Sequence, residues 1–136
     1  MSRRLEPEGW RPPSGYANGV EAKGRMIFVA GQVGWGPDAL MVGADLVSQA
    51  RQALRNIADV LACGHALPRH VTRMTWYVVD LEEYRRERRR LGEAYREVMG
   101  DHYPAMTLVQ VAGLVETGAR VEIEATAVVP DAPDQT

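Results

Sequence analysis

Two acidic side chains near the carboxyl end of the chain are the first candidates for chemistry. Glu122 and Glu124 alternate with the apolar residues Val121, Ile123 and Ala125. This alternation predicts a strand with one apolar face and one face that carries the acids. A carboxylate on a sheet can transfer protons or orient a water molecule if partial burial raises its pKa. The pattern by itself favours a simpler alternative, in which both acids are solvated on the polar face of an edge strand.

An arginine-rich run, residues 84–90, suggests nucleic-acid binding at first sight because five of its seven residues are arginines. Acidic residues lie around the run and can form ion pairs with it at helical spacing; they are Glu82, Glu83, Glu87 and Glu93. No aromatic residue is interleaved for stacking on bases, as a single-strand binder needs. We therefore expect an ion-paired, solvated helix face and do not expect a nucleic-acid partner.

The histidines and the cysteine do not predict a metal site. His65, His70 and His102 lack the spacing of metal ligands, such as two on one helical turn. Cys63 is the only cysteine, which excludes an internal disulfide and a cysteine-based zinc cage. We expect no metal and no cofactor, and we expect Cys63 to pack as a small apolar group.

The composition indicates an ordinary globular protein. The 136 residues suit a single domain spanning residues 1–136, and a formal net charge of −2 creates no overall attraction for nucleic acid or anionic membranes. No apolar run approaches the roughly 20 residues of a membrane helix. The first residues lack the apolar stretch of a signal peptide. Together with the single cysteine, these features predict a cytoplasmic protein without a membrane partner.

Two helices follow from apolar periodicity. Residues 44–63 carry an apolar stripe at helical spacing, and Gly64 is a natural cap at the end. A second helix begins after Asp80, which suits an N-cap, and is expected to run without interruption to about Met99 before Gly100.

Strands are predicted between and around these helices. We expect them over residues 16–22, 26–30, 70–79, 104–111 and 120–129, with the first two paired as a hairpin. Residues 31–43 form a glycine-rich loop. Residues 1–13 read as an irregular arm, and residues 130–136 as a flexible tail. The order of elements predicts an α+β fold with a mixed sheet and two helices packed on one face.

Six short stretches of the sequence carry a family resemblance. They are Tyr16–Gly19, Val29–Val33, Gln49 with Asn56 and Ile57, Tyr77–Asp80, Pro104–Ala105 and Val121–Ala125. None is specific alone, but in this order and spacing they resemble the reactive-intermediate deaminase family, known as RidA or YjgF. The resemblance implies a chorismate-mutase-like fold and a homotrimer with sites at the three clefts between subunits. It also implies cofactor-free hydrolysis of small enamines or imines to ketones and ammonia.

The resemblance assigns roles to three residues. Glu122 matches the family glutamate that positions the hydrolytic water. Tyr16 matches a tyrosine in the cleft, whose hydroxyl can donate to a carboxylate or a water; the alternative is an aromatic anchor for the N-terminal arm. Gly31 matches a position where the backbone approaches the ligand, which needs no side chain there. A plain strand-to-loop turn at Gly31 is compatible with that role.

Three positions depart from the family pattern. Met106 stands where deaminating members have an arginine that binds the substrate carboxylate, and Leu108 stands where many have cysteine. A thioether cannot bind a carboxylate, so standard imino-acid deamination is doubtful. Arg88 occupies a position that is usually asparagine. We hypothesise that Arg88 is a relocated anion anchor; the alternative is that its stem is buried while its head reaches water or a glutamate.

Two functions remain open from the sequence. The first is a trimeric enzyme that hydrolyses a small enamine, imine or related intermediate through Glu122 and Tyr16, with substrate contacts from Gly31, Met106, Leu108 and Arg88. The second is a trimer that binds a small metabolite in the same clefts without turnover. An endoribonuclease is a remote third, since it rests only on the arginine run and a family label.

Overall fold

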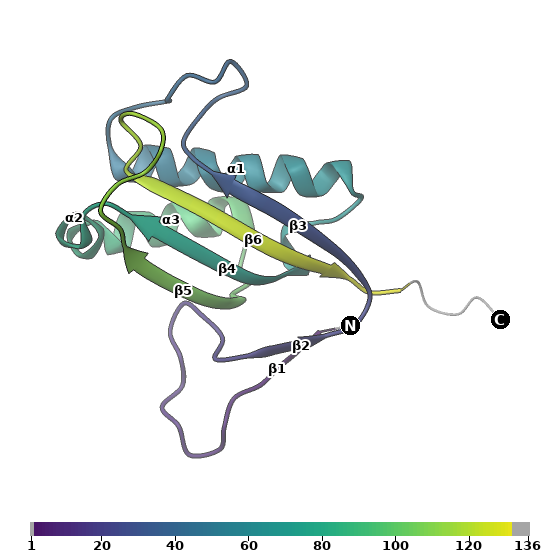
Figure 1. The fold of residues 1–136 in the computed structure, drawn as a ribbon. Helices are drawn as coiled ribbons and strands as arrows, with labels where there is room; N and C mark the ends of the chain where they lie inside the picture. The colour runs from purple at the N-terminus through teal and green to yellow at the C-terminus, as the bar shows by residue number, and fades with distance from the viewer. Residues whose placement is uncertain (1, 132–136) are drawn as a thin grey trace.

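Four strands form the main sheet of this computed structural model, which describes residues 2–131 (Figure 1). In spatial order they are β3 (Arg25–Gln32), β6 (Val121–Val129), β4 (Val71–Val78) and β5 (Ala105–Gln110). The β3–β6 and β6–β4 pairs are antiparallel, whereas β4 and β5 are parallel. The prediction of a mixed sheet is therefore confirmed.

The helices α1 (Leu46–Cys63) and α3 (Arg88–Met99) cover one face of this sheet (Figure 1). Asp45 caps α1, because its carboxylate accepts a hydrogen bond from the backbone N–H of Ser48 at 2.9 Å. Gly64 closes the other end, as predicted. Cys63 is exposed, so the expectation that it packs as an apolar group is wrong; it lies in the last turn, off the buried stripe.

The second predicted helix is interrupted. It begins with a short helix, α2 (Leu81–Arg86), and Asp80 caps it as expected by accepting from the backbone N–H groups of Glu82 and Glu83. The backbone of Glu87 (φ −101°, ψ 12°) then leaves helical geometry. The two helices on either side of this break differ in burial. α3 buries an apolar stripe against the core, whereas α2 has no buried residue.

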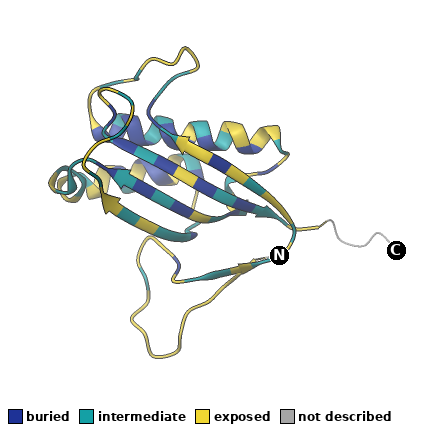
Figure 2. Ribbon diagram, in the orientation of Figure 1, coloured by how far each residue is buried: buried dark blue, intermediate teal, exposed yellow. Residues whose placement is uncertain are grey.

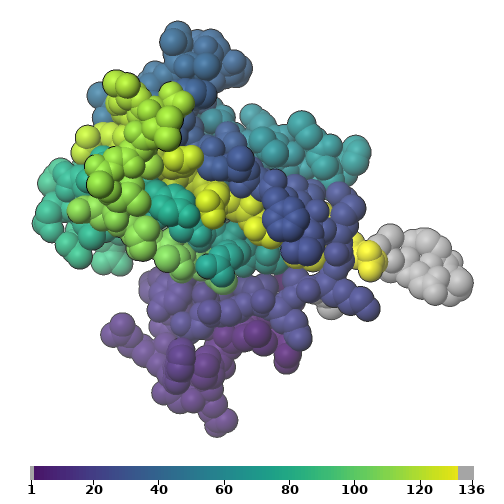
Figure 3. Space-filling model, viewed as in Figure 1, coloured from purple at the N-terminus to yellow at the C-terminus, as the bar shows by residue number. Residues whose placement is uncertain are grey.

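The N-terminal segment differs from the prediction. β2 (Val20–Ala22) does not form a hairpin with β3 but pairs antiparallel with β1 (Ser2–Arg4) in a separate two-stranded sheet. The first strand therefore lies inside the segment 1–13 that was expected to be irregular. Within residues 2–131, β3 pairs with β6 along one edge, and its other edge does not pair with β2. Figure 3 shows residues 5–15 (purple) projecting from the body of the molecule.

The chain ends are described only in part. Pro130 and Asp131, at the start of the segment predicted to be a flexible tail, are exposed and lie outside any strand. Residues 132–136, the rest of that segment, lie outside the described residues, as does Met1. Within residues 2–131, no helix has the length and apolar character needed to cross a membrane.

The core lies between the sheet and the helices. Leu54, Ile57 and Leu61 of α1 are fully buried, together with Met74 of β4 and Ile123 of β6. Figure 2 shows the consequence along β4 and β6, where buried residues alternate with more exposed ones. Alternate side chains of a strand point to opposite faces, so only one face of the sheet meets the helices.

The opposite face of the sheet has no helix on it and carries exposed apolar side chains. On β3, Phe28 is 71% exposed and Met26 is 56% exposed, and Val109 of β5 is also exposed. Glu122 and Glu124 of β6 lie on the same face, because Ile123 between them is buried on the helix side. Apolar residues of this size on a strand surface are typical of a face that another protein surface covers.

Candidate functional site

A first cleft, of about 490 Å³, lies where α3, the edge strand β5 and residues 14–16, which follow the N-terminal arm, meet. Four of the residues predicted for the site line it: Tyr16, Arg88, Met106 and Leu108. They come from three separate segments, and the parallel pairing of β5 with β4 brings Leu108 beside Trp76. The cleft wall is rich in aromatic rings; they are Tyr16, Trp76, Tyr84, Tyr95 and Tyr103.

Tyr95 and Tyr103 form a rigid wall of this cleft. Their rings stack with centroids 5.3 Å apart and an interplanar angle of 13°. The Tyr95 hydroxyl donates to the backbone carbonyl of His102 at 2.5 Å, and burial raises the pKa of this phenol because it disfavours the phenolate. The His102 ring in turn contacts the Val71 carbonyl at 2.7 Å. These contacts hold Tyr95, Tyr103 and His102 in place, so that the two tyrosine rings support the cleft.

A second cleft, of about 470 Å³, contains the other two predicted residues, Gly31 and Glu122. The glutamate carboxylate lies against the glycine, so that a Cβ at Gly31 would overlap it. Asn56 of α1 shapes the same cleft by donating to the carbonyls of Val33 and Trp35, at 3.2 and 2.8 Å. The absence of a side chain at Gly31 therefore leaves room for the Glu122 side chain.

Within one chain, the two groups of predicted residues lie on opposite faces of the sheet. Met106 and Leu108 pack against the core on the helix side. Glu122 lies on the other side, because its neighbours Val121 and Ile123 are fully buried under the helices. A single chain therefore does not bring Glu122 to the cleft that contains Met106 and Arg88.

The two clefts carry opposite charges. Arg88 and Arg96 line the first cleft, and no acidic residue does. The second cleft is lined by Asp59, Glu116 and Glu122, and by no arginine, lysine or histidine. The charges are thus sorted between the two clefts although the whole chain is nearly neutral, with a formal net charge of −2.

The arginine run is largely paired with the acids around it. Ion pairs join Arg85 to Glu82, Arg89 to Glu93 and Arg90 to Glu87, at N–O distances of 2.9, 3.6 and 2.7 Å. Glu83 bonds elsewhere, to Arg120. No carboxylate among the described residues lies within ion-pair distance of Arg88, so the glutamate contact that we considered for its head is not made.

Two further residues that line the first cleft are not among the predicted site residues. Arg96 lies eight residues after Arg88, which places both on one face of α3, and this spacing was the available signal. Trp76 is 4% exposed and lines the cleft, but its indole Nε1 has no hydrogen-bond partner among residues 2–131. This tryptophan belongs to the hydrophobic core and also lines the cleft.

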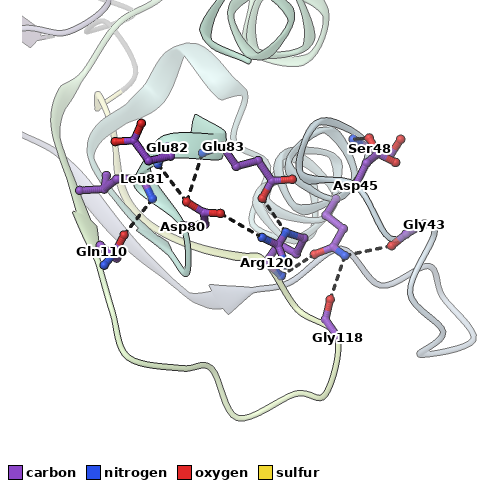
Figure 4. A network of polar contacts seen from close by, with 11 residues as sticks. Gly43, Asp45, Ser48, Asp80, Leu81, Glu82, Glu83, Gln110, Gly118 and Arg120 are labelled. Atoms are coloured by element: carbon purple, nitrogen blue, oxygen red, sulfur yellow. Dashed lines mark hydrogen bonds and ion pairs between the residues drawn. The ribbon is translucent and has the colours of Figure 1, made fainter. Parts of the chain in front are cut away.

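Dashed lines from Gly43, Gly118 and Arg120 (Figure 4) mark hydrogen bonds to one buried glutamine, which joins the loops beside the second cleft. Gln49 of α1 is fully buried; its amide donates to the carbonyls of Gly43 and Gly118, at 2.9 and 3.0 Å, and its oxygen accepts from the backbone N–H of Arg120 at 2.7 Å. The Arg120 guanidinium also binds Glu83 at 2.5 Å. No three histidine, cysteine or acidic side chains gather to hold a metal ion in the part of the chain that the structure describes.

Comparisons with known proteins agree on one family. The model of the family described as endoribonuclease L-PSP matches residues 9–129. The chain is 30% identical to the 2-iminobutanoate/2-iminopropanoate deaminase of Homo sapiens, over 76% of this chain and 73% of that protein. It is 31% identical to the putative reactive intermediate deaminase TdcF of Escherichia coli, over 83% of this chain and 85% of that protein. A crystal structure of YyfB from Yersinia pestis, a Rid-family protein of unknown function, superposes with a TM-score of 0.84 and 32% identity, over 94% of this chain and 98% of that chain.

Proposed function

Because the chain belongs to the RidA/YjgF family, whose model is described as endoribonuclease L-PSP, we propose that it hydrolyses a small reactive enamine or imine to a carbonyl compound and ammonia. The observation that carries this proposal is the Glu122 carboxylate, which lies over a glycine in a cleft that has no basic residue to neutralise it. Two relatives named as deaminases support the reaction class. A reducing, cytoplasmic setting is the compartment that we propose.

The reaction that we propose needs only water and proton transfer. Water adds to the electrophilic carbon of the imine while the Glu122 carboxylate accepts one of its protons. That proton then passes to the nitrogen and gives a carbinolamine. The carboxylate next takes the hydroxyl proton and delivers it to the amino group, so that the carbon–nitrogen bond breaks and ammonia leaves with the electrons of that bond as the carbonyl forms. An enamine first becomes the imine by gaining a proton at carbon and losing one from nitrogen. Each step is balanced without a metal or a redox cofactor.

The complete site, in this proposal, is shared between subunits of a homotrimer. The first cleft of one subunit would face the second cleft of the next, in a head-to-tail ring. Three observations support it: the predicted residues are divided between the two faces of the sheet, the two clefts are oppositely charged, and Phe28 and Met26 expose apolar surface on the face without helices. In this arrangement Glu122 of one subunit would act on a substrate held by Arg88 of its neighbour.

Substrate recognition in this proposal does not use position 106. Met106 has no charge and packs against the core, whereas Arg88 is exposed at the cleft and has no carboxylate partner within residues 2–131. A guanidinium at this place can bind a substrate carboxylate by two parallel hydrogen bonds. We therefore propose that Arg88 supplies the anchor, with Tyr16 covering the substrate from the arm.

Ammonia release from freshly generated imino acids tests the function. We expect release by the wild type and its loss in Glu122→Ala, with Glu124→Ala as a matched control on the same strand and face. Met106→Arg should raise the rate with 2-iminobutanoate, because it adds a cation in the same cleft. If the wild type binds keto acids but releases no ammonia with any imino acid, the chain is a metabolite-binding protein and the proposed hydrolysis is wrong. Cleavage of RNA by the same preparations would instead support the family's endoribonuclease label.

A further inference from the structure

We propose that the first cleft is built for a small organic dianion, held by Arg88 and Arg96 together. The inference rests on the proposed function in placing the substrate in this cleft, and it narrows the substrate class. The preferred substrate is then the imine or enamine that corresponds to a short 2-oxo acid with two carboxylates, rather than to one with a single carboxylate.

The charge of the cleft favours two anionic groups. Its lining contains two guanidinium groups and no acid. The glutamates of α3 are occupied elsewhere: Glu93 pairs with Arg89, and Glu97 pairs with both Arg51 and Arg55, at 3.1 and 2.8 Å. No carboxylate in the described part of the chain lies within ion-pair distance of either cleft arginine. Two uncompensated charges in one cleft repel each other unless a ligand neutralises both.

A glycine in the middle of α3 determines where the second charge lies. Arg88, Gly92 and Arg96 follow one another at single-turn intervals on one helix face. A Cβ at Gly92 would lie 3.3 Å from Nη1 of Arg96 and 4.0 Å from its Cζ, so the guanidinium lies back over the glycine. Arg96 therefore brings its charge about one turn closer to Arg88 than its own α-carbon is. Glycine is unfavourable inside a helix, and its presence here is explained by the space that it leaves.

The size of the site fits a short dicarboxylate. The α-carbons of Arg88 and Arg96 are two helical turns apart, roughly 12 Å along the axis, and the folded-back head of Arg96 shortens the separation of the charges. An acid of four or five carbons, with a carboxylate at each end, can contact both guanidiniums across such a gap. A monocarboxylate can contact only one of them.

Calorimetric titration with two stable keto acids tests this assignment on the full chain. 2-Oxoglutarate carries two carboxylates, and 2-oxobutanoate carries one. We expect the wild type to bind 2-oxoglutarate about tenfold or more tighter, since a second charge-assisted pair is gained. Arg96→Gln should remove this preference and leave the affinity for 2-oxobutanoate nearly unchanged. Arg89→Gln is the matched control, because Arg89 lies on the same helix but pairs with Glu93 and does not line the cleft.

Two results would overturn the assignment. One is equal affinity of the wild type for the two acids; the other is a loss of preference in Arg89→Gln as large as that in Arg96→Gln, which would mean a diffuse charge effect. Neither titration requires turnover, so the inference can fail separately from the proposed function. A preference for 2-oxoglutarate without any ammonia release would retain the dianion site and exclude the hydrolysis. Ammonia release without any preference for 2-oxoglutarate would support the hydrolysis and exclude the dianion site.

Discussion

The carboxylate of Glu122 lies in the space that a side chain at Gly31 would fill. This contact joins β6 to the end of β3, at the point where the pairing of the two strands shifts between Val29 and Gln32. Such bulges are frequent beside active sites because they change the direction of a side chain or of the backbone. The glutamate therefore lies against the backbone of Gly31, and no salt bridge to it is formed by any residue between 2 and 131.

Replacement of Gly31 by alanine should impair catalysis more than folding. The new Cβ would displace the Glu122 carboxylate, and a shift of about 1 Å at a catalytic group can lower the rate roughly a hundredfold. Ammonia release and urea unfolding of the same variant separate the two effects. Gly113→Ala is the control, because a Cβ there meets no atom within 4 Å. Normal activity in Gly31→Ala would show that the position of Glu122 does not matter for the reaction.

Mixing two inactive variants should restore activity if the site is shared between subunits. Arg88→Ala damages the first cleft and Glu122→Ala the second, and these lie on opposite faces of one chain. After unfolding and refolding together, about a quarter of the clefts in a random head-to-tail trimer would combine an intact half from each parent. Ammonia release should then approach that fraction of the wild-type rate. No recovery in a mixture shown by light scattering to be trimeric would place the whole site within one chain.

The sequence predicted the elements that apolar patterns determine. The helix over residues 44–63 and the strands β4 and β6 were expected within one or two residues of their bounds, because each buries one face regularly. The β1–β2 pair was missed, since it is short and exposed and has no apolar pattern. The break at Glu87 was also missed, because helical periodicity and favourable helix formers continue through it.

The division of the site could be foreseen only in part. Alternation along β6 already placed Glu122 on the face opposite the buried residues. The face on which Met106 lies depends on the parallel pairing of β5 with β4 and on the position of α3, and neither is encoded locally. Nothing in the sequence around Trp76 shows that its indole N–H is buried without a hydrogen-bond partner among residues 2–131.

The cap of α1 should make stability depend on acid. The hydrogen bond from the Ser48 backbone N–H is the main cause that holds the pKa of Asp45 below its ordinary value of 3.8. Since the folded-state pKa is the lower one, the stabilisation is present above about pH 4 and is lost as the pH falls through the folded-state pKa. Asp45→Ala should therefore cost about 1 kcal/mol in the free energy of unfolding near neutral pH. In urea titrations the difference from wild type should shrink at about pH 3, and Asp45→Asn should retain most of the stability at neutral pH. An equal cost at both pH values would mean that the charge of Asp45 plays no part.

Replacement of Gly92 by alanine should stabilise the protein and weaken the binding of dicarboxylates. Alanine is more favourable than glycine inside a helix by about 1 kcal/mol, and the only close neighbour of the new Cβ is the flexible end of Arg96. The unfolding free energy should therefore rise, while the displaced guanidinium should lower the affinity for 2-oxoglutarate and not that for 2-oxobutanoate. In an Arg96→Gln background the same change should still stabilise but have no further effect on binding, because the two residues act through one contact. Additive losses of affinity in the double variant would show that Gly92 influences the ligand by a route other than Arg96.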